Sequence, residues 1–203
     1  MWGVVVAVNL SCPPWCESHL AWDLSNPSAG FVHYGPELVL EIAEVVVIGV
    51  VRRISMRVSA RDHGESRRCV IEMMDPHGVG LELTADEARQ VVEMFIEAAD
   101  VRLTSPDGEC PSWCLEDADP DLDDPDDERE HRGPFREMVV AGTHEPSVPI
   151  GVRVRAFDEE DERRVSLEML VKSISTELLA AEACKISAHL LDCADLAELV
   201  NVP

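Results

Sequence analysis

The chain carries the same set of metal-ligand residue types twice, at identical spacing. The first set follows the pattern C-x3-C-x2-H-x13-H and the second follows C-x3-C-x2-D-x13-H. The surrounding letters repeat as well, with CPPWCESH in the first set and CPSWCLED in the second. Two matched sets in one chain indicate a tandem duplication. The candidate ligands are Cys12, Cys16, His19 and His33 in the first repeat and Cys110, Cys114, Asp117 and His131 in the second.

The duplication divides the 203 residues into two units of about 95 residues each. We assign residues 1–103 to the first repeat, 104–109 to a linker and 110–203 to the second repeat. The linker TSPDGE is short and rich in turn-forming residues, so we expect the units to pack closely. Because a duplicated homodimer tends to retain its isologous interface, we expect a pseudo-two-fold pair.

Both repeats show the same order of predicted elements after the ligand cluster. In the first, hydrophobic and polar residues alternate through 53–61 and again through 69–73, which predicts a β-hairpin. The segment TADE beginning at Thr84 is typical of a helix start, and hydrophobic spacing predicts an amphipathic helix over 85–100. The second repeat has Leu179 in place of this threonine, so we expect its helix to begin earlier or to fray. The predicted fold class is α+β, each unit being a metal-knuckle loop, a small antiparallel β-sheet and a C-terminal α-helix.

The repeated residue types are those that bind zinc in structural sites. Zinc favours tetrahedral sets of thiolate and imidazole, and the first repeat offers two cysteines and two histidines. The alternative there is a disulfide between Cys12 and Cys16, or a turn with free thiols. In the second repeat Asp117 replaces His19; a carboxylate is an acceptable zinc ligand, but the change equally fits a weakened site. Hydrolysis would be confined to this second site, because four protein ligands leave no position for a catalytic water at the first.

The cysteine count favours a reducing compartment. Seven cysteines form an odd set, which suits a secreted disulfide framework poorly. Cys69 and Cys193 fall in hydrophobic segments, where we expect them to be small core residues. We therefore expect a cytoplasmic protein with thiolate-bound metal. No stretch approaches the roughly 20 apolar residues of a membrane span, and the apolar segment 2–10 is expected to be a strand because it lacks the features of a signal peptide.

The chain is strongly acidic, with a formal net charge of −23. This charge opposes direct binding to nucleic acids and to anionic membranes. Ten acidic residues lie in the loop 115–130 of the second repeat, which equals its counterpart in length. The simpler interpretation is a solvated surface, and the other is a site for a basic protein partner. The partner-binding candidates are Glu116, Asp119, Asp121, Asp123, Asp124, Asp126 and Asp127.

Arginines gather on the predicted hairpins of both repeats. A nucleic-acid surface would require them to outweigh the surrounding acids. We expect instead that they pair with neighbouring Glu and Asp side chains. The residues concerned are Arg52, Arg53, Arg57, Arg61, Arg67 and Arg68 in the first repeat and Arg153, Arg155, Arg163 and Arg164 in the second.

The first repeat resembles an uncharacterised family of small proteins found in actinobacteria and their phages. The resemblance rests on CPPWC at 12–16, His19, HYGP at 33–36 and LTADEAR at 83–89. It covers nearly the whole chain when the second repeat is counted as a divergent member. The resemblance implies a cytosolic, zinc-binding domain and implies no activity.

Three functional hypotheses follow. The leading one is a non-enzymatic, zinc-stabilised module that binds another protein, since the chain lacks the G-x-S-x-G, P-loop, Rossmann and H-E-x-x-H patterns. The first alternative is an acidic decoy that occupies a basic nucleic-acid-binding surface of a host protein and whose binding weakens steeply with salt. The second alternative is a metal-dependent hydrolase that uses the second site.

Overall fold

The computed structural model describes residues 12–21, 30–42, 52–63, 66–100, 110–118, 129–142, 147–159 and 162–199. The first repeat contains β1 (Ser18–Ala21), β2 (Phe31–Tyr34), β3 (Leu38–Ile42), β4 (Arg52–His63), β5 (Ser66–Met74), β6 (Gly80–Leu83) and α1 (Ala85–Asp100). The second contains β7 (Glu116–Ala118), β8 (Arg129–Arg132), β9 (Arg136–Gly142), β10 (Val148–Glu159), β11 (Glu162–Val171), β12 (Ile174–Leu178) and α2 (Ala180–Glu198). The same order of elements occurs twice, so the prediction of an α+β chain with antiparallel strands and a C-terminal helix in each repeat is confirmed.

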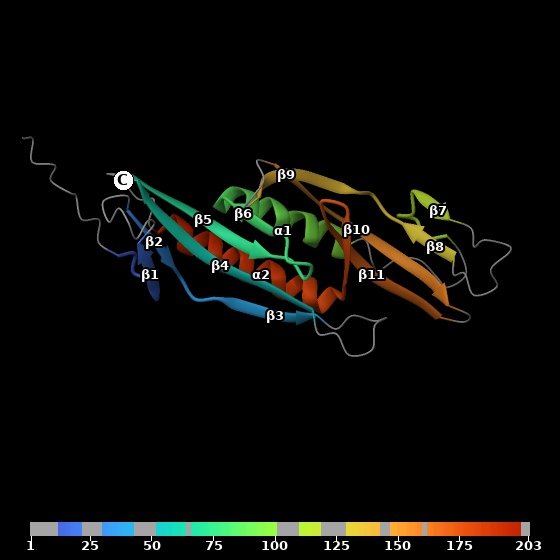
Figure 1. Cartoon of the computed structure of the whole chain (residues 1–203). Helices are drawn as coiled ribbons and strands as arrows, with labels where there is room; N and C mark the ends of the chain where they lie inside the picture. Colours follow the sequence, from blue (N-terminus) through green and yellow to red (C-terminus); the bar gives the residue numbers. More distant parts are fainter. Residues whose placement is uncertain are drawn as a thin grey trace, which may run out of the picture.

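The strands of the described residues form a single antiparallel sheet. Each repeat is built on a long hairpin, β4 with β5 and β10 with β11. The first strand of each hairpin pairs along its other edge with two short strands, β3 and β2 beside β4, and β9 and β8 beside β10. The two halves of the sheet join where Leu81 of β6 pairs with Gly142 of β9. Figure 1 shows the result as an elongated molecule with β1–β2 at one end and β7–β8 at the other.

One face of the sheet is apolar because the long strands alternate hydrophobic and polar residues. Ile54 and Met56 of β4 are buried, as are Ile150 and Val152 of β10. These side chains belong to one hydrophobic cluster that contains residues of both repeats and both helices. Cys69 and Cys193 lie buried in the same cluster, as small core residues should. The two repeats therefore share a single core.

Each helix packs mainly on strands of the other repeat. The main strand contacts of α2 are with β3, β4 and β5, and those of α1 are with β10. The helices also contact each other extensively and run side by side along the middle of the molecule (Figure 1). Neither helix in the described part of the chain is long and apolar enough to cross a membrane. The helices are thus exchanged between the repeats, in the sense that each covers strands of the other repeat. Neither repeat therefore buries its apolar faces alone.

The helix starts differ in their capping. The Thr84 amide donates to Glu87 Oε2 at 2.7 Å, and the Glu87 amide donates to Thr84 Oγ1 at 3.2 Å, which confirms the predicted capping box. Leu179 supplies no side-chain cap, yet its amide donates to Glu182 Oε2 at 2.7 Å. The second helix consequently begins at the equivalent residue, Ala180, and the expected earlier start is not observed.

Arginines on the other face of the sheet pair with acids, as expected. Arg57 lies 2.8 Å from Glu72, and Arg61 lies 2.6 Å from Glu82. In the second repeat Arg155 lies 3.2 Å from Glu168. The positive charge of these arginines is thus balanced within the sheet.

Candidate metal sites

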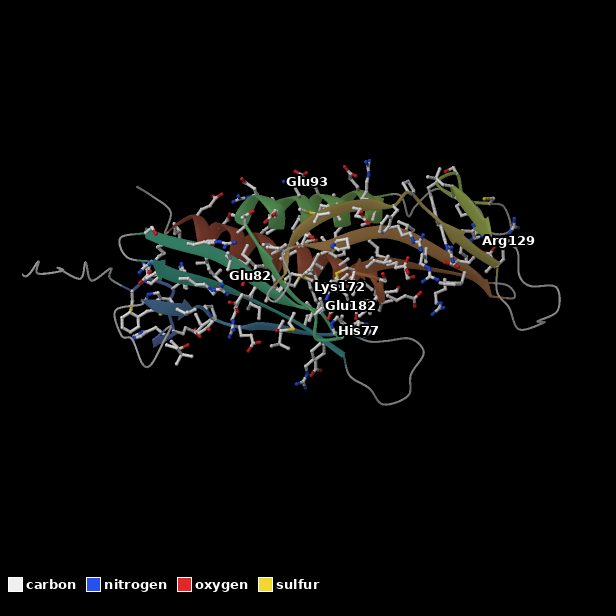
Figure 2. The ribbon with its side chains drawn as sticks, turned by 45° about the horizontal axis from the view of Figure 1, so that its top comes forward. His77, Glu82, Glu93, Arg129, Lys172 and Glu182 are labelled. Carbon is white, nitrogen blue, oxygen red and sulfur yellow. The ribbon has the colours of Figure 1, made fainter. Side chains whose placement is uncertain are left out.

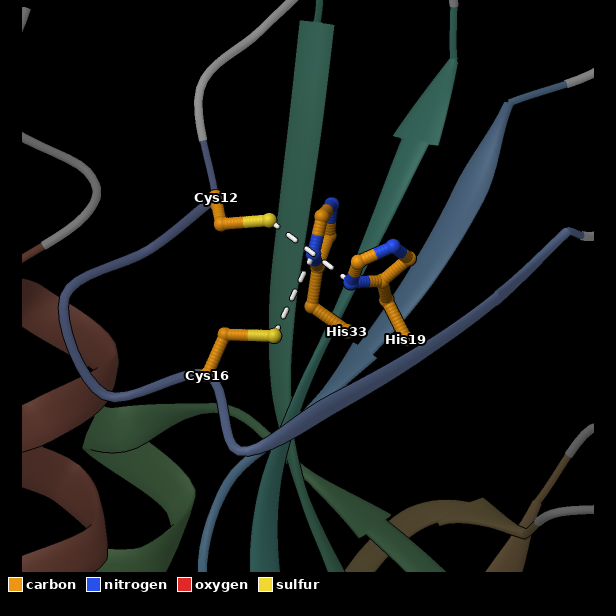
Figure 3. Close-up of side chains that lie close together, drawn as sticks. All are labelled: Cys12, Cys16, His19 and His33. Carbon is orange, nitrogen blue, oxygen red and sulfur yellow. Dashed lines mark hydrogen bonds between the residues drawn. The ribbon is translucent and has the colours of Figure 1, made fainter.

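Cys12, Cys16, His19 and His33 come together beside the β1–β2 end of the sheet (Figure 3). Their ligand atoms all lie within 4.8 Å of one another. Cys12 Sγ lies 3.7 Å from His19 Nδ1, and Cys16 Sγ lies 3.5 Å from His33 Nδ1. Two thiols and two imidazoles this close could hold a metal ion.

Local backbone pairing places these side chains. The Cys16 amide donates to the Pro13 carbonyl at 3.0 Å, which closes a turn between the two cysteines. Residues of β1 and β2 pair so that His19 lies directly opposite His33. His33 in turn pairs with Ala60 of β4, which ties the ligand cluster to the long hairpin. A short turn and a strand pair therefore bring together residues far apart in the sequence.

A tryptophan packs beneath the cysteine turn. Trp15 is buried, and a Cβ atom added at Gly35 would lie only 3.3 Å from its Cε3 atom. The Gly35 amide also donates to the Val58 carbonyl at 2.9 Å. Glycine follows β2 here because the indole ring and the β4 backbone leave little room for a side chain.

The buried histidine has a carboxylate on the side away from the cysteines. His33 Nδ1 faces Cys16, while its Nε2 lies 2.9 Å from Asp62 Oδ2. Arg67 donates to both oxygens of Asp62, at 2.6 and 3.1 Å. Asp62 and Arg67 are a cross-strand pair at the end of the β4–β5 hairpin. A carboxylate at one ring nitrogen orients the imidazole so that the other nitrogen can serve as a metal ligand.

The supporting carboxylate remains ionised. Burial acts to raise the pKa of the Asp62 carboxyl, but hydrogen bonds from Arg67 and His33 outweigh it, and the pKa lies below its usual 3.8. At the cluster itself, burial and then the neighbouring Cys12 raise the pKa of the Cys16 thiol. A metal ion bound there would have to displace a proton, so binding should strengthen with rising pH.

Cys110, Cys114 and His131 form the matching cluster, with His131 in β8. Figure 1 shows β7 and β8 at the end of the molecule opposite β1 and β2. Their ligand atoms also lie within 4.8 Å of one another, so this group could hold a metal ion too. The Cys114 amide closes the same turn, donating to the Pro111 carbonyl at 2.9 Å. Asp117 pairs with His131 in the backbone register that His19 has with His33; its side chain lies outside the described residues.

The second repeat also has an aspartate and an arginine behind its buried histidine. His131 is fully buried, and its Nε2 lies 2.9 Å from Asp158 Oδ2. Arg163 donates to both oxygens of Asp158, at 2.6 and 3.0 Å. The hydrogen bond from Arg163 is the main reason that the pKa of the Asp158 carboxyl falls to about 2. In both repeats the cysteine pair lies beside a histidine, the histidine contacts an aspartate, and an arginine donates to that aspartate.

A family model described as a domain of unknown function, DUF6907, matches residues 3–102 and a second time residues 100–200. The chain belongs to the DUF6907 family. The two matches confirm that an uncharacterised family is present in two tandem copies. No curated protein matches the chain.

The two DUF6907 copies agree at more positions than the predicted ligands. The predicted site residues do not include Asp62 and Asp158, because each stands beside a charged hairpin turn, where an acidic residue suggests only solvation. The signal that could have identified them is an aspartate followed five positions later by an arginine, present in both copies as Asp62 with Arg67 and Asp158 with Arg163.

Most of the acidic residues predicted to bind a partner lie outside the described residues. These are Asp119, Asp121, Asp123, Asp124, Asp126 and Asp127, while Glu116 falls in β7 with an undescribed side chain. The linker 104–109 and the predicted strand at 2–10 also lie outside. Partner binding by the acidic loop of the second DUF6907 copy stays a prediction.

Proposed function

We propose that the chain is a non-enzymatic, zinc-stabilised module that binds another protein. The observation that carries the zinc assignment is the pair of thiol and imidazole clusters, each with ligand atoms within 4.8 Å and a carboxylate behind its buried histidine. Thiolate and imidazole ligands suit Zn²⁺ better than the oxygen-preferring cations.

A structural role for the metal is supported by the shape of each end of the sheet. β1 and β2 have four residues each, too few to stabilise a hairpin by themselves. A metal held by ligands from the cysteine turn, β1 and β2 would cross-link them next to the tip of the β4–β5 hairpin. A full set of four protein ligands also leaves no coordination position for substrate or water.

For the second site we infer that Asp117 supplies the fourth ligand. Its backbone position opposite His131 supports this, because His19 holds the same position opposite His33. A carboxylate in place of an imidazole adds one negative charge to the site. The two sites should therefore differ in affinity while keeping the same fold.

The remaining parts of the proposal have separate support. The exchange of helices between the repeats supports a pseudo-two-fold pair. All seven cysteines are free thiols, which supports a reducing cytoplasm as the location. A protein partner fits better than a nucleic acid, because the net charge is −23 and the sheet arginines named above already pair with acids.

Thermal unfolding in the presence and absence of a zinc chelator tests this function. A structural metal predicts a large fall in Tm on chelation, together with loss of β-sheet signal at lower temperature. A hydrolase that uses an open metal site would instead lose activity on chelation and keep its Tm. Unchanged stability in the chelator would contradict the proposal.

A further inference from the structure

Helices α1 and α2 enclose an apolar groove on the solvent side of the helix pair. The groove has a volume of about 400 Å³, and its lining includes Val92, Phe95 and Ile96 of α1 and Ala183, Ser187 and Leu191 of α2. In the part of the chain that the structure describes, Ile96 is 52% exposed and Leu191 is 38% exposed. Large apolar side chains that stay accessible along a groove are characteristic of an interaction surface.

The charged residues around this groove are mostly acidic. Glu93 lies on the outward side of α1 (Figure 2), one position after a groove residue, and Asp192 follows Leu191 on α2. At one end, Arg89 is held by Asp195 at 3.0 Å and by Glu198. Asp86 is also exposed there and lies 3.9 Å from Arg89. Lys185 follows Cys184 of the groove, and Glu97, which follows Ile96, pairs with Arg136 at 3.2 Å. Arg89 and Arg136 already pair with acids, so among the described residues beside the groove Glu93 and Asp192 are the acids opposed by the single base Lys185.

We propose that this groove binds an amphipathic helix of a partner protein, with lysine or arginine flanking its apolar face. The inference rests on the proposed protein-binding function and names the surface and the chemistry of the partner. A helix laid along the groove would bury Ile96 and Leu191 under its apolar face. Its basic flanks would face Glu93 and Asp192, which gives the pairing its charge complementarity.

A second copy of the chain fits the groove less well. Two copies would bring two acidic rims together, and each carries a net charge of −23. Like charges placed opposite each other across an interface are repulsive and disfavour that pairing. A basic partner removes this repulsion, and salt should weaken its binding.

The test uses the zinc-loaded full chain and a synthetic amphipathic peptide with leucine on one face and lysine on the other. Binding is measured by fluorescence anisotropy of the labelled peptide. We expect Ile96→Gln and Leu191→Gln each to weaken binding about tenfold, as for anchor residues of an interface. Val139→Gln is the matched control, because Val139 is 58% exposed on β9 and does not line the groove. A peptide with glutamate in place of lysine should not bind.

Equal binding of the lysine and glutamate peptides would overturn the proposal, as would binding that Ile96→Gln and Val139→Gln affect alike. A dimer in analytical ultracentrifugation that Ile96→Gln dissociates would also overturn it, because a second copy would then be the occupant. If the zinc-loaded chain does not bind the peptide, the groove assignment is wrong, and the proposal of a zinc-stabilised module is unaffected. If chelation leaves the Tm unchanged, the proposed function fails independently of the groove.

Discussion

His33 Nε2 and Asp62 Oδ2 lie 2.9 Å apart, and the equivalent atoms of His131 and Asp158 are separated by the same distance. The duplication has therefore kept the group behind the buried histidine as well as the histidine itself. In metal sites such a carboxylate sets the orientation and basicity of the ligand. The contact connects each cysteine turn to the tip of a hairpin, where an arginine holds the aspartate in turn.

The first prediction concerns this supporting carboxylate. Replacing Asp62 by Asn keeps the shape of the side chain and removes the charge that orients His33. We expect the zinc affinity of the first site to fall about 10- to 100-fold, with the second site unchanged. Competition with a chromophoric chelator measures both affinities in one titration. Asp86→Asn on the surface of α1 is the control, and equal affinities for the two variants would mean that Asp62 does not support the ligand.

A second prediction distinguishes the two sites at their fourth ligand. Asp117→His would restore the ligand set of the first repeat and should raise the zinc affinity of the second site. Asp117→Ala should lower it, since three ligands would remain. The same chelator competition reads out both variants, and Leu115→Ala, at an exposed neighbouring position, serves as control. If neither substitution changes the zinc affinity of the second site, Asp117 is not a ligand.

A third prediction follows from the glycine that lies against Asp62. Gly30 has φ +110°, and a Cβ atom there would lie 2.2 Å from the Asp62 carbonyl oxygen. Gly78 also has positive φ, +82°, but a Cβ there would meet nothing within 4 Å. Alanine at either position costs backbone strain, and only Gly30→Ala must also displace Asp62. We expect its loss of unfolding free energy to exceed that of Gly78→Ala by about 1–3 kcal/mol, as in overpacked sites.

Urea unfolding of both glycine variants checks this difference, and zinc titration adds a second readout. Gly30→Ala should weaken the first metal site because Asp62 moves, whereas Gly78→Ala should leave it unchanged. Similar losses of stability in the two variants would show that the close approach to Asp62 has no energetic consequence.

A fourth prediction concerns acid stability. The pKa of the Asp158 carboxyl is about 2 in the folded chain, against a usual 3.8, chiefly because Arg163 donates to it. A depressed folded-state pKa contributes stability that is fully present above the unfolded value and is lost as the pH falls through the folded value. Between about pH 4 and pH 2, the free energy of unfolding should therefore decline less in Asp158→Asn than in the parent chain.

Metal-free protein is the proper sample for this comparison, because thiolates and imidazoles take up protons above that window and release the metal. Unfolding followed by circular dichroism at several pH values gives both curves. Parallel curves for the parent and Asp158→Asn would show that the contact with Arg163 does not persist in solution.

The local elements were predictable because their signals lie within a few residues. The Thr84 capping box and the hydrophobic period define α1 over Ala85–Asp100, the predicted range. The ligand residues stand out because the duplication repeats their spacing. Each of these features depends on residues near in sequence or on the comparison of one repeat with the other.

The relationships between distant elements could not be predicted in the same way. Hydrophobic periodicity shows which face of a helix is buried but not which sheet covers it, so the exchange of α1 and α2 between repeats has no local signal. The contact of His33 with Asp62 depends on the register of β2 against β4, which the sequence does not specify. An aspartate beside a charged turn has no distinguishing signal in the sequence, and only the strand register places it behind a ligand.

Zinc binding by both repeats can be measured by native mass spectrometry of protein purified under reducing conditions without added zinc. We expect a zinc ion in each repeat, one fewer in Cys16→Ser and in Cys114→Ser, and no change in Cys184→Ser, because the exposed Cys184 lies outside both clusters. Metal-free protein would contradict the assignment of a zinc site to each repeat. So would a mass lower by two hydrogens for each cysteine pair before reduction, because disulfides would then occupy the places assigned to the metal.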